Sequence, residues 1–130
     1  MPGEAPELGR LAYVMLGVSE LNRSLYFYRD VLGLAVTSEI AGFVFLDGRG
    51  VTLCLSESLG RGAGVLAGAV EVVFEVSGVQ EAFAGLRGRG VSFLRDPHRV
   101  TDDRWAASFR DPDGHILSIF GPERASPGVH

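Results

Sequence analysis

Apolar runs along the chain fall into two similar halves. The run YVMLGVSEL (13–21) aligns with EVVFEVSGV (71–79). The run LDGRGVTLCL (46–55) aligns with RDPDGHILSIF (110–120), and each has an Asp, a Gly and then an apolar stretch with one small polar side chain. Self-similarity of this kind predicts two copies of one supersecondary unit.

The repeat predicts five segments along the chain. The segment that joins the two copies, SLGRGAGVLAG, is rich in glycine, as flexible linkers are. The expected segments are an N-terminal tail (1–9), a first module (10–57), the Gly-rich linker (58–68), a second module (69–121) and a C-terminal tail (122–130).

The first module is expected to begin with a strand and a helix. The aliphatic run Leu11–Val18 predicts the strand, and Ser19 stands where a helix N-cap belongs. Gly33 is expected to end the helix. The apolar residues that share one helical face are Leu21, Leu25, Tyr28 and Leu32.

The second module repeats this beginning. Ser77 and Gln80 have the spacing of a capping box, which predicts a helix start, and Gly90 is expected to end the helix. Its apolar face holds Val79, Phe83 and Leu86.

Three strands are expected to complete each module. The turn sequences DGRG and DPDG separate strands, and His98 follows a proline in a predicted turn. The predicted strands are AVTSEI, GFVFLD and VTLCLSE in the first module, and VSFLR, RWAASFRD and HILSIF in the second.

Two tandem βαβββ modules predict an α+β fold whose curved mixed sheets surround a ligand cavity, with helices outside. Because side chains alternate along a strand, one face of each sheet packs on a helix and the other lines the hollow. We assign the purely aliphatic positions to the helices. The mixed positions assigned to the hollow are Tyr13, Thr52, Cys54, Glu71 and Ser118.

Two of these stretches resemble signatures of a known family. SLYFYRDVLGL (24–34) and RDPDGHILSIF (110–120) resemble the first-helix and last-strand signatures of the vicinal oxygen chelate superfamily, also called the glyoxalase/bleomycin resistance protein/dioxygenase family. The resemblance covers nearly the whole chain. It implies paired βαβββ modules, a homodimer and a ligand site in the hollow.

The same resemblance implies four strand positions at which enzymes of this family hold a divalent metal through His, Glu or Gln. In this chain they fall on Tyr13, Cys54, Glu71 and Ser118, of which only Glu71 is an ordinary ligand. No pair among the three histidines, His98, His115 and His130, has metal-ligand spacing. We therefore expect no metal and no cofactor.

Ligand contacts are expected from the hollow-facing positions. Tyr13 offers a ring for stacking, and Glu71 offers a carboxylate that either anchors a ligand or pairs with an Arg or Tyr13. Trp105 follows the polar loop HRVTDDR, a candidate cavity rim; Phe43, Phe45, Phe93, Phe109 and Phe120 are further aromatic candidates, most of them for the core. The predicted ligand-binding residues are Tyr13, Met15, Thr52, Cys54, Glu71, Val73, Trp105, Ser118 and Phe120.

Composition narrows the function classes. The net charge is −4 and no basic cluster is present, which argues against nucleic acid as a partner. All 12 basic residues are Arg, so Schiff-base lysine chemistry is excluded. The single Cys excludes an internal disulfide and fits the cytoplasm, and no apolar run is long enough to cross a membrane.

The sequence favours a metal-independent small-molecule-binding protein of the glyoxalase/bleomycin-resistance type. It would sequester a largely apolar or planar compound, such as an antibiotic, between aromatic walls. The alternative is a metal-dependent lyase, isomerase or dioxygenase of the same superfamily that uses Glu71, as a base or in an unusual Cys54–Glu71 metal site. A third interpretation is a partner-binding dimer whose hollow is vestigial.

Overall fold

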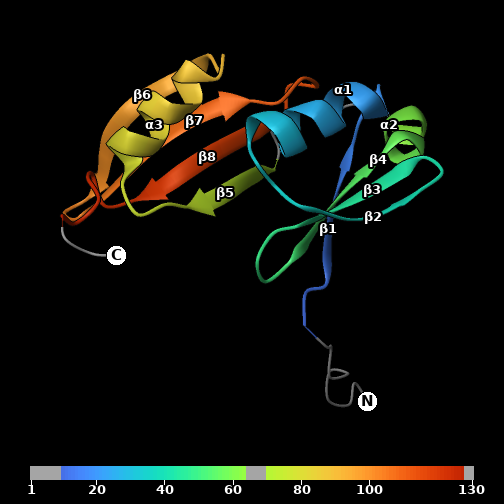
Figure 1. Ribbon diagram of the computed structural model, residues 1–130, viewed down its shortest axis with the longest axis horizontal. Coiled ribbons are helices and arrows are strands. Elements are labelled where there is room, and N and C mark those ends of the chain that lie inside the picture. The colour runs from blue at the N-terminus through green and yellow to red at the C-terminus, as the bar shows by residue number, and fades with distance from the viewer. Residues whose placement is uncertain (1–9, 64–69, 128–130) are drawn as a thin grey trace, which may run out of the picture.

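The computed structural model describes residues 10–63 and 70–127, and the side chains of 61–63 are not described. Figure 1 shows two sheets side by side, each with its own helical layer. The first module contains β1 (Tyr13–Gly17), α1 (Leu21–Leu25), η1 (Tyr26–Val31), β2 (Val36–Ile40), β3 (Phe43–Asp47), β4 (Thr52–Ser56) and α2 (Glu57–Ala63). The second contains β5 (Glu71–Glu75), α3 (Val79–Gly88), β6 (Phe93–Thr101), β7 (Arg104–Arg110) and β8 (Ile116–Gly121).

The two sheets have the same topology. The strand orders are β1-β4-β3-β2 and β5-β8-β7-β6. In each sheet the first and last strands of the module are parallel neighbours, and the other pairings are antiparallel. The α+β fold with two tandem βαβββ modules is therefore confirmed.

The first helix of each module ends at the expected glycine, but the two helices differ inside. Gly33 and Gly90 have φ values of +85° and +94°, a region that favours glycine. In the first module α1 continues into the π-helix η1, where the Leu32 amide donates to the Phe27 carbonyl at 2.9 Å. This wider turn accommodates one extra residue, because the segment from Leu21 to Gly33 is one residue longer than the segment from Val79 to Gly90. The two copies of the repeat are therefore aligned again at the terminal glycine.

Neither predicted N-cap is observed. The helix-flanking residues are Glu20 and Gly78, and neither cap makes a side-chain hydrogen bond. The Ser19 hydroxyl instead donates to Asp113 at 2.6 Å, and the Leu21 amide is bound by the Glu57 carboxylate at 3.0 Å. Partners from distant segments therefore replace the local cap that the sequence pattern predicts.

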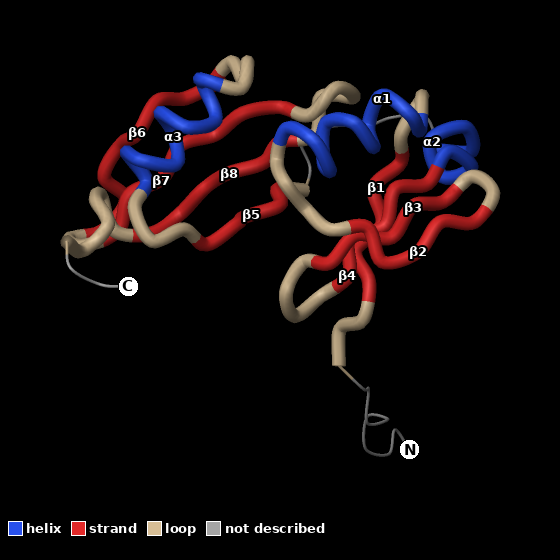
Figure 2. Tube along the Cα trace, viewed as in Figure 1, coloured by secondary structure: helices blue, strands red, loops and turns tan. Residues whose placement is uncertain are grey.

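The predicted tails and linker are only partly described. The helix α2 follows β4 directly (Figure 2), so the first residues of the predicted flexible linker are helical. Residues 64–69 and 1–9 lie outside the described residues. After β8, the Pro122 and Glu123 carbonyls accept hydrogen bonds from the Val79 and Gln80 amides at 2.9 Å each, which fixes that part of the C-terminal tail to α3.

Strand β6 is longer than expected. It runs through Pro97 and His98, which the sequence pattern placed in a turn, and its pairing with β7 shifts register three times. It is the edge strand of its sheet, a position at which proline and bulges are tolerated because one side needs no partner. His98 is therefore a strand residue.

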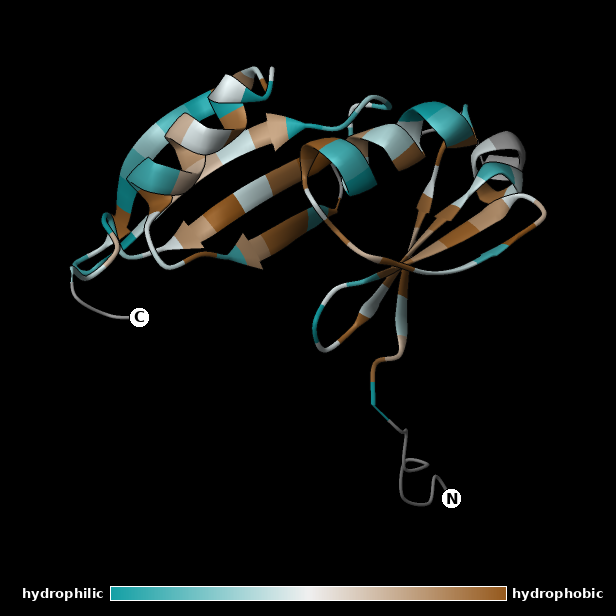
Figure 3. Cartoon of the chain, viewed as in Figure 1, coloured by the Kyte–Doolittle hydropathy of each residue, from teal (hydrophilic) through white to brown (hydrophobic). Residues whose placement is uncertain are grey.

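A continuous apolar core lies between the helices and the sheets. Figure 3 shows hydrophobic residues concentrated along the inner strands. Phe93 and Phe109 lie 5.3 Å apart between ring centroids, and Phe27 of the first module lies 6.4 Å from Phe109 of the second. The core cluster accordingly includes residues of both modules, among them Leu16, Leu46 and Leu117.

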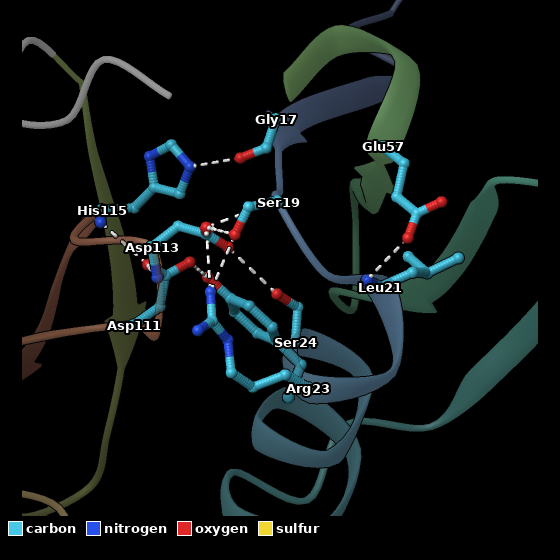
Figure 4. Close-up of polar contacts among 10 residues, drawn as sticks. Gly17, Ser19, Leu21, Arg23, Ser24, Glu57, Asp111, Asp113 and His115 are labelled. Carbon is cyan, nitrogen blue, oxygen red and sulfur yellow. Dashed lines mark hydrogen bonds and ion pairs between the residues drawn. The ribbon is translucent and has the colours of Figure 1, made fainter. Parts of the chain in front are cut away.

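The DPDG turn between β7 and β8 fastens the second module to the first (Figure 4). The Asp113 side chain is 3% exposed and pairs with Arg23 at 3.2 Å. It also accepts hydrogen bonds from the Ser19 amide at 3.1 Å and the Ser24 hydroxyl at 3.2 Å. One buried carboxylate of the second module thus holds the start of the first helix.

Asp111 organises the same turn. Its carboxylate accepts the Asp113 and His115 amides at 2.9 and 2.8 Å and the Tyr28 hydroxyl at 2.7 Å. Burial and the nearby Asp111 charge raise the pKa of Tyr28 far above its ordinary value. The His115 Nε2 donates to the Gly17 carbonyl at 2.7 Å, so His115 points into the module junction.

Candidate ligand-binding site

In the first module, four of the predicted ligand contacts lie on one face of the sheet. The pairing of β1 with β4 places Tyr13 beside Thr52 and Met15 beside Cys54. The pairing of β3 with β4 adds Phe45 next to Cys54. Neighbours in register share a face, so these residues form one surface, which we call the first mixed face.

Aromatic rings dominate the first mixed face. Tyr13 and Phe45 lie 5.8 Å apart in an edge-to-face arrangement, and Phe43 stacks beside Phe45 at 6.5 Å. Tyr13 is 57% exposed and Met15 is 47% exposed. An aromatic wall of this kind, open to solvent, is suited to stacking against a planar or apolar molecule.

Cys54 lies beneath this wall and is fully buried. Its burial raises the pKa of the thiol, which donates a hydrogen bond to the Leu55 carbonyl at 3.8 Å. A buried, protonated thiol is a small apolar group and a poor nucleophile or metal ligand.

Helix α2 closes one end of the first mixed face. Gly17 belongs to that face by alternation, and a Cβ placed on it would lie 3.0 Å from the Gly60 backbone nitrogen. The neighbouring Ser56 is 1% exposed and its hydroxyl accepts the Leu59 amide at 3.1 Å. The glycines allow the helix backbone to approach the strand this closely, which a side chain would prevent.

The second module presents a matching face with different chemistry. Val73 pairs with Ser118 and Glu75 with Phe120, and Glu71 shares their side of β5. We call this the second mixed face. Val73 is 53% exposed, whereas Ser118 is 3% exposed. The apolar wall is therefore thinner here, and polar groups lie beside it.

A chain of hydrogen bonds crosses the second mixed face. The Ser118 hydroxyl donates to the Glu71 carboxylate. The Ser108 hydroxyl lies 3.0 Å from that of Ser118. Since the single Ser118 proton is used on Glu71, Ser108 is the donor in this pair. The chain ends at a solvent-exposed carboxylate that can accept further hydrogen bonds from a ligand donor.

The observed partner of Glu71 is Ser118, not an Arg or Tyr13. Among the described side chains, which leave out 61–63, the ion pairs join Arg23 with Asp113 and Arg29 with Asp30. Sequence reasoning included Glu71 and Ser118 but missed Ser108. Alternation along RWAASFRD puts Ser108 on the face opposite Phe109, which is the signal that could have found it.

The six aromatic candidates divide between the two sides of the sheets. Phe43, Phe45 and Phe120 lie on the mixed faces. Phe93 and Phe109 lie in the core. Trp105 pairs with Gly121, which alternates to the sheet face opposite Phe120, so Trp105 packs against the core. The Arg99 guanidinium lies 5.9 Å from the centre of its ring. We therefore leave Trp105 out of the proposed site.

The donor atoms at the four metal positions do not fit a divalent cation. The Cys54 thiol is buried and protonated, the Ser118 hydroxyl is bound to Glu71, and the Tyr13 ring packs on Phe45. Only the Glu71 carboxylate is an ordinary ligand, and a catalytic zinc or iron site needs two or three. Across the described part of the chain, no group of three or more His, Cys, Asp or Glu residues is arranged to hold a metal.

The two mixed faces stay separate within one chain. Between described residues, no hydrogen bond or ring contact joins the Tyr13–Phe45 wall to the Ser118–Glu71 chain. Helix α3 lies over one face of the second sheet (Figure 1) and leaves the second mixed face uncovered. Two further apolar side chains are exposed just before the first strand of each module, Leu11 at 72% and Val70 at 62%. Within one chain, the four positions predicted to meet in one space therefore lie on two separate faces. That they meet when two chains assemble stays a prediction; the four are Tyr13, Cys54, Glu71 and Ser118.

Comparison with known proteins identifies the family. The model of the glyoxalase/bleomycin resistance protein/dioxygenase superfamily matches residues 10–119. The two tandem βαβββ modules, each with a core face and a mixed face on its sheet, agree with that match. The chain belongs to this superfamily.

Individual relatives are distant. The chain is 28% identical over 124 residues to the uncharacterized protein YraH of Bacillus subtilis, covering 85% of this chain and 97% of that protein. It is similar in fold to TnmS3, an antibiotic binding protein from Streptomyces sp. CB03234 (20% identity, TM-score 0.75, covering 91% of this chain and 99% of that one). It is also similar in fold to lactoylglutathione lyase from Agrobacterium tumefaciens (20% identity, TM-score 0.72, covering 88% of this chain and 94% of that one).

Proposed function

We propose that this protein is a metal-independent small-molecule-binding protein that sequesters a largely apolar or planar compound, such as an antibiotic. The observation that carries the proposal is the aromatic wall formed by the exposed Tyr13 and the half-buried Phe45, with Phe43 stacked beside Phe45. Large apolar side chains gathered on one face and open to solvent are typical of a binding site. The mismatch between the metal positions and any divalent cation supports the absence of metal chemistry.

The polar side of the site suggests which group on the ligand is recognised. The Ser108–Ser118–Glu71 chain ends in a carboxylate acceptor. A ligand with a hydroxyl, amine or other N–H donor next to a flat apolar body would satisfy both mixed faces. TnmS3, with the same fold, binds an antibiotic, which supports this class of ligand for the present chain.

A homodimer would complete the proposed site. In one chain, Tyr13, Met15 and Val73 are each about half exposed, at 57%, 47% and 53%. A second copy related by two-fold symmetry would set the first mixed face of one chain opposite the second mixed face of the other.

Cytoplasmic localisation stays a prediction. No helix within the described residues is long and apolar enough to span a membrane.

Substitution of Tyr13 tests the binding site directly. In a panel of planar antibiotics followed by isothermal titration calorimetry, we expect Tyr13→Ala to weaken any bound compound by about tenfold or more, because stacked area is lost. Tyr26→Ala is the matched control, since Tyr26 is 61% exposed on a helix away from the mixed faces. Equal loss in both variants, or none in Tyr13→Ala, contradicts the proposed site.

The alternative is an enzyme that uses Glu71, and one observation favours it. The hydrogen-bond chain holds Glu71 in place at an exposed carboxylate, as a general base requires. Under this alternative, Glu71→Gln abolishes turnover of a bound compound while leaving its affinity within about threefold. Under sequestration, no product forms with either variant, and Glu71→Gln lowers affinity for ligands that carry a donor.

A further inference from the structure

A cavity lies on the core side of the second sheet, opposite the second mixed face. Its volume is about 360 Å³, and it lies between the end of η1, α3 and the core face of the second sheet. Leu32 and Leu34 form the wall from the first module, Ala82 and Gly85 line it from α3, and Phe74 and Ile119 form the floor. This volume is at the lower end of the range for small-molecule sites.

Gly85 lines this cavity and adds no side chain to it. A Cβ placed on Gly85 would meet no heavy atom within 4 Å. Glycine inside a helix costs about 1 kcal/mol relative to alanine, so it is not a residue that helix stability selects. Nothing in the fold requires the absence of a side chain at this position, and the glycine leaves space that a larger residue would fill.

The first module shows what the same helix position holds when it is filled. Counted from the start of the helix, the residue equivalent to Gly85 is Phe27; counted back from the terminal glycine, it is Tyr28. Phe27 packs against Phe109, and Tyr28 is fully buried. In one copy an aromatic ring fills the space between helix and sheet, whereas in the other copy the space is left open.

Within the part of the chain that the structure describes, Arg89 is the one charged residue that lines the cavity. Its Nη1 donates to the Asp30 and Val31 carbonyls at 3.1 and 3.4 Å, which holds the guanidinium at the junction of α3 and η1. Among the described residues, its Nε and Nη2 have no hydrogen-bond partner. The remaining lining is apolar and offers no other side chain that could recognise a polar group.

We infer that this cavity is a second ligand site, separate from the mixed faces, which binds an aliphatic monocarboxylate. The alkyl chain lies between α3 and the Leu32–Leu34 segment, and the carboxylate binds the free edge of the Arg89 guanidinium. A single cation at the edge of an aliphatic cavity matches a ligand with one anionic group and an apolar tail.

The test uses sodium octanoate, below the concentration at which it forms micelles, titrated into the full-length protein by calorimetry. We expect saturable binding that Gly85→Leu weakens at least about tenfold, because the leucine side chain occupies the cavity. Gly88→Leu is the matched control: it lies on the same helix, its Cβ also meets nothing within 4 Å, and it does not line the cavity. Thermal melts of both variants establish that they fold.

Two further comparisons fix the ligand class and the site. Arg89→Gln should weaken octanoate about tenfold, and Arg89→Lys should weaken it less, because the ammonium keeps the charge but loses the two-nitrogen edge of the guanidinium; neutral octanol should not distinguish the two variants. Tyr13→Ala and Glu71→Gln should leave octanoate binding unchanged, since they lie on the mixed faces. The inference is overturned if octanoate does not saturate, if Gly85→Leu binds like the wild type, or if Tyr13→Ala abolishes binding. It is also overturned if octanoate fails to bind and Gly85→Leu changes the oligomeric mass, because a second copy would then cover the cavity.

Discussion

At the scale of single residues, the fold depends on a few buried polar partners that link the modules. Tyr28 is fully buried and gives its hydroxyl proton to Asp111 at 2.7 Å. Asp111 in turn shapes the DPDG turn through the amides of Asp113 and His115. A side chain of the first module therefore helps to set the turn that precedes β8, the strand that carries Ser118.

We predict that Tyr28→Phe lowers the free energy of unfolding by about 1–3 kcal/mol near pH 7, because one Asp111 oxygen loses its donor in the interior. Urea unfolding followed by circular dichroism measures this. Tyr26→Phe is the control, since Tyr26 is 61% exposed. A Tyr28→Phe protein as stable as the wild type would remove the hydroxyl from the interactions that hold the modules together.

The same residue predicts a pH dependence with a definite sign. The pKa of Tyr28 is raised in the folded protein above its ordinary value of 10.0, so the fold favours the neutral phenol. The stabilisation is complete below that value and is lost as the pH rises above it, because the unfolded chain then ionises first. In the Tyr28→Phe variant this decline in stability should be shallower.

At the scale of elements, sequence patterns predicted the repeat and the strands but not the contacts that come from elsewhere in the chain. Strand alternation assigned Tyr13, Cys54 and Ser118 to the faces on which the register places them. Helix caps were mispredicted because Ser19 and Leu21 find partners in Asp113 and Glu57. Neither partner is adjacent in sequence, so no local pattern could indicate them.

The segment after β4 and Trp105 also differ from the prediction. The segment after β4 is glycine-rich, which argued for a flexible linker, yet its glycines allow α2 to lie close against β1. The polar loop before Trp105 predicts that this residue lies at a cavity rim, but the register of β7 with β8 places it on the core side. A cue from a neighbouring loop does not determine which face of a strand a residue occupies.

The close contact between α2 and β1 gives a prediction at this scale. A Cβ on Gly60 would lie 2.3 Å from the Val18 carbonyl oxygen, so Gly60→Ala must push the helix away from the strand. We expect a loss of about 1–3 kcal/mol in unfolding free energy. The matched control is Gly88→Ala, which adds a methyl group in open space and should stabilise by up to about 1 kcal/mol. The same sign for both variants would contradict this packing.

At the scale of the whole molecule, the two sides of the sheets have different roles. The core side joins both modules through Phe27 and Phe109, and the polar turn at Asp113 fixes their relation. The other side carries the aromatic wall of the first module and the carboxylate chain of the second, and leaves both open. This division agrees with the proposed function, in which a second copy would bring the two mixed faces together around a small molecule.

The most direct test of the central claim is whether ligand binding needs a metal. The protein is treated with EDTA, and its melting temperature is followed with each member of a panel of planar antibiotics, for the wild type and for Tyr13→Ala. Metal-independent sequestration predicts that at least one compound raises the melting temperature of the EDTA-treated wild type, and that Tyr13→Ala loses this stabilisation. Stabilisation that appears only after zinc, iron, nickel or manganese is restored, and that Glu71→Gln abolishes, would contradict the account.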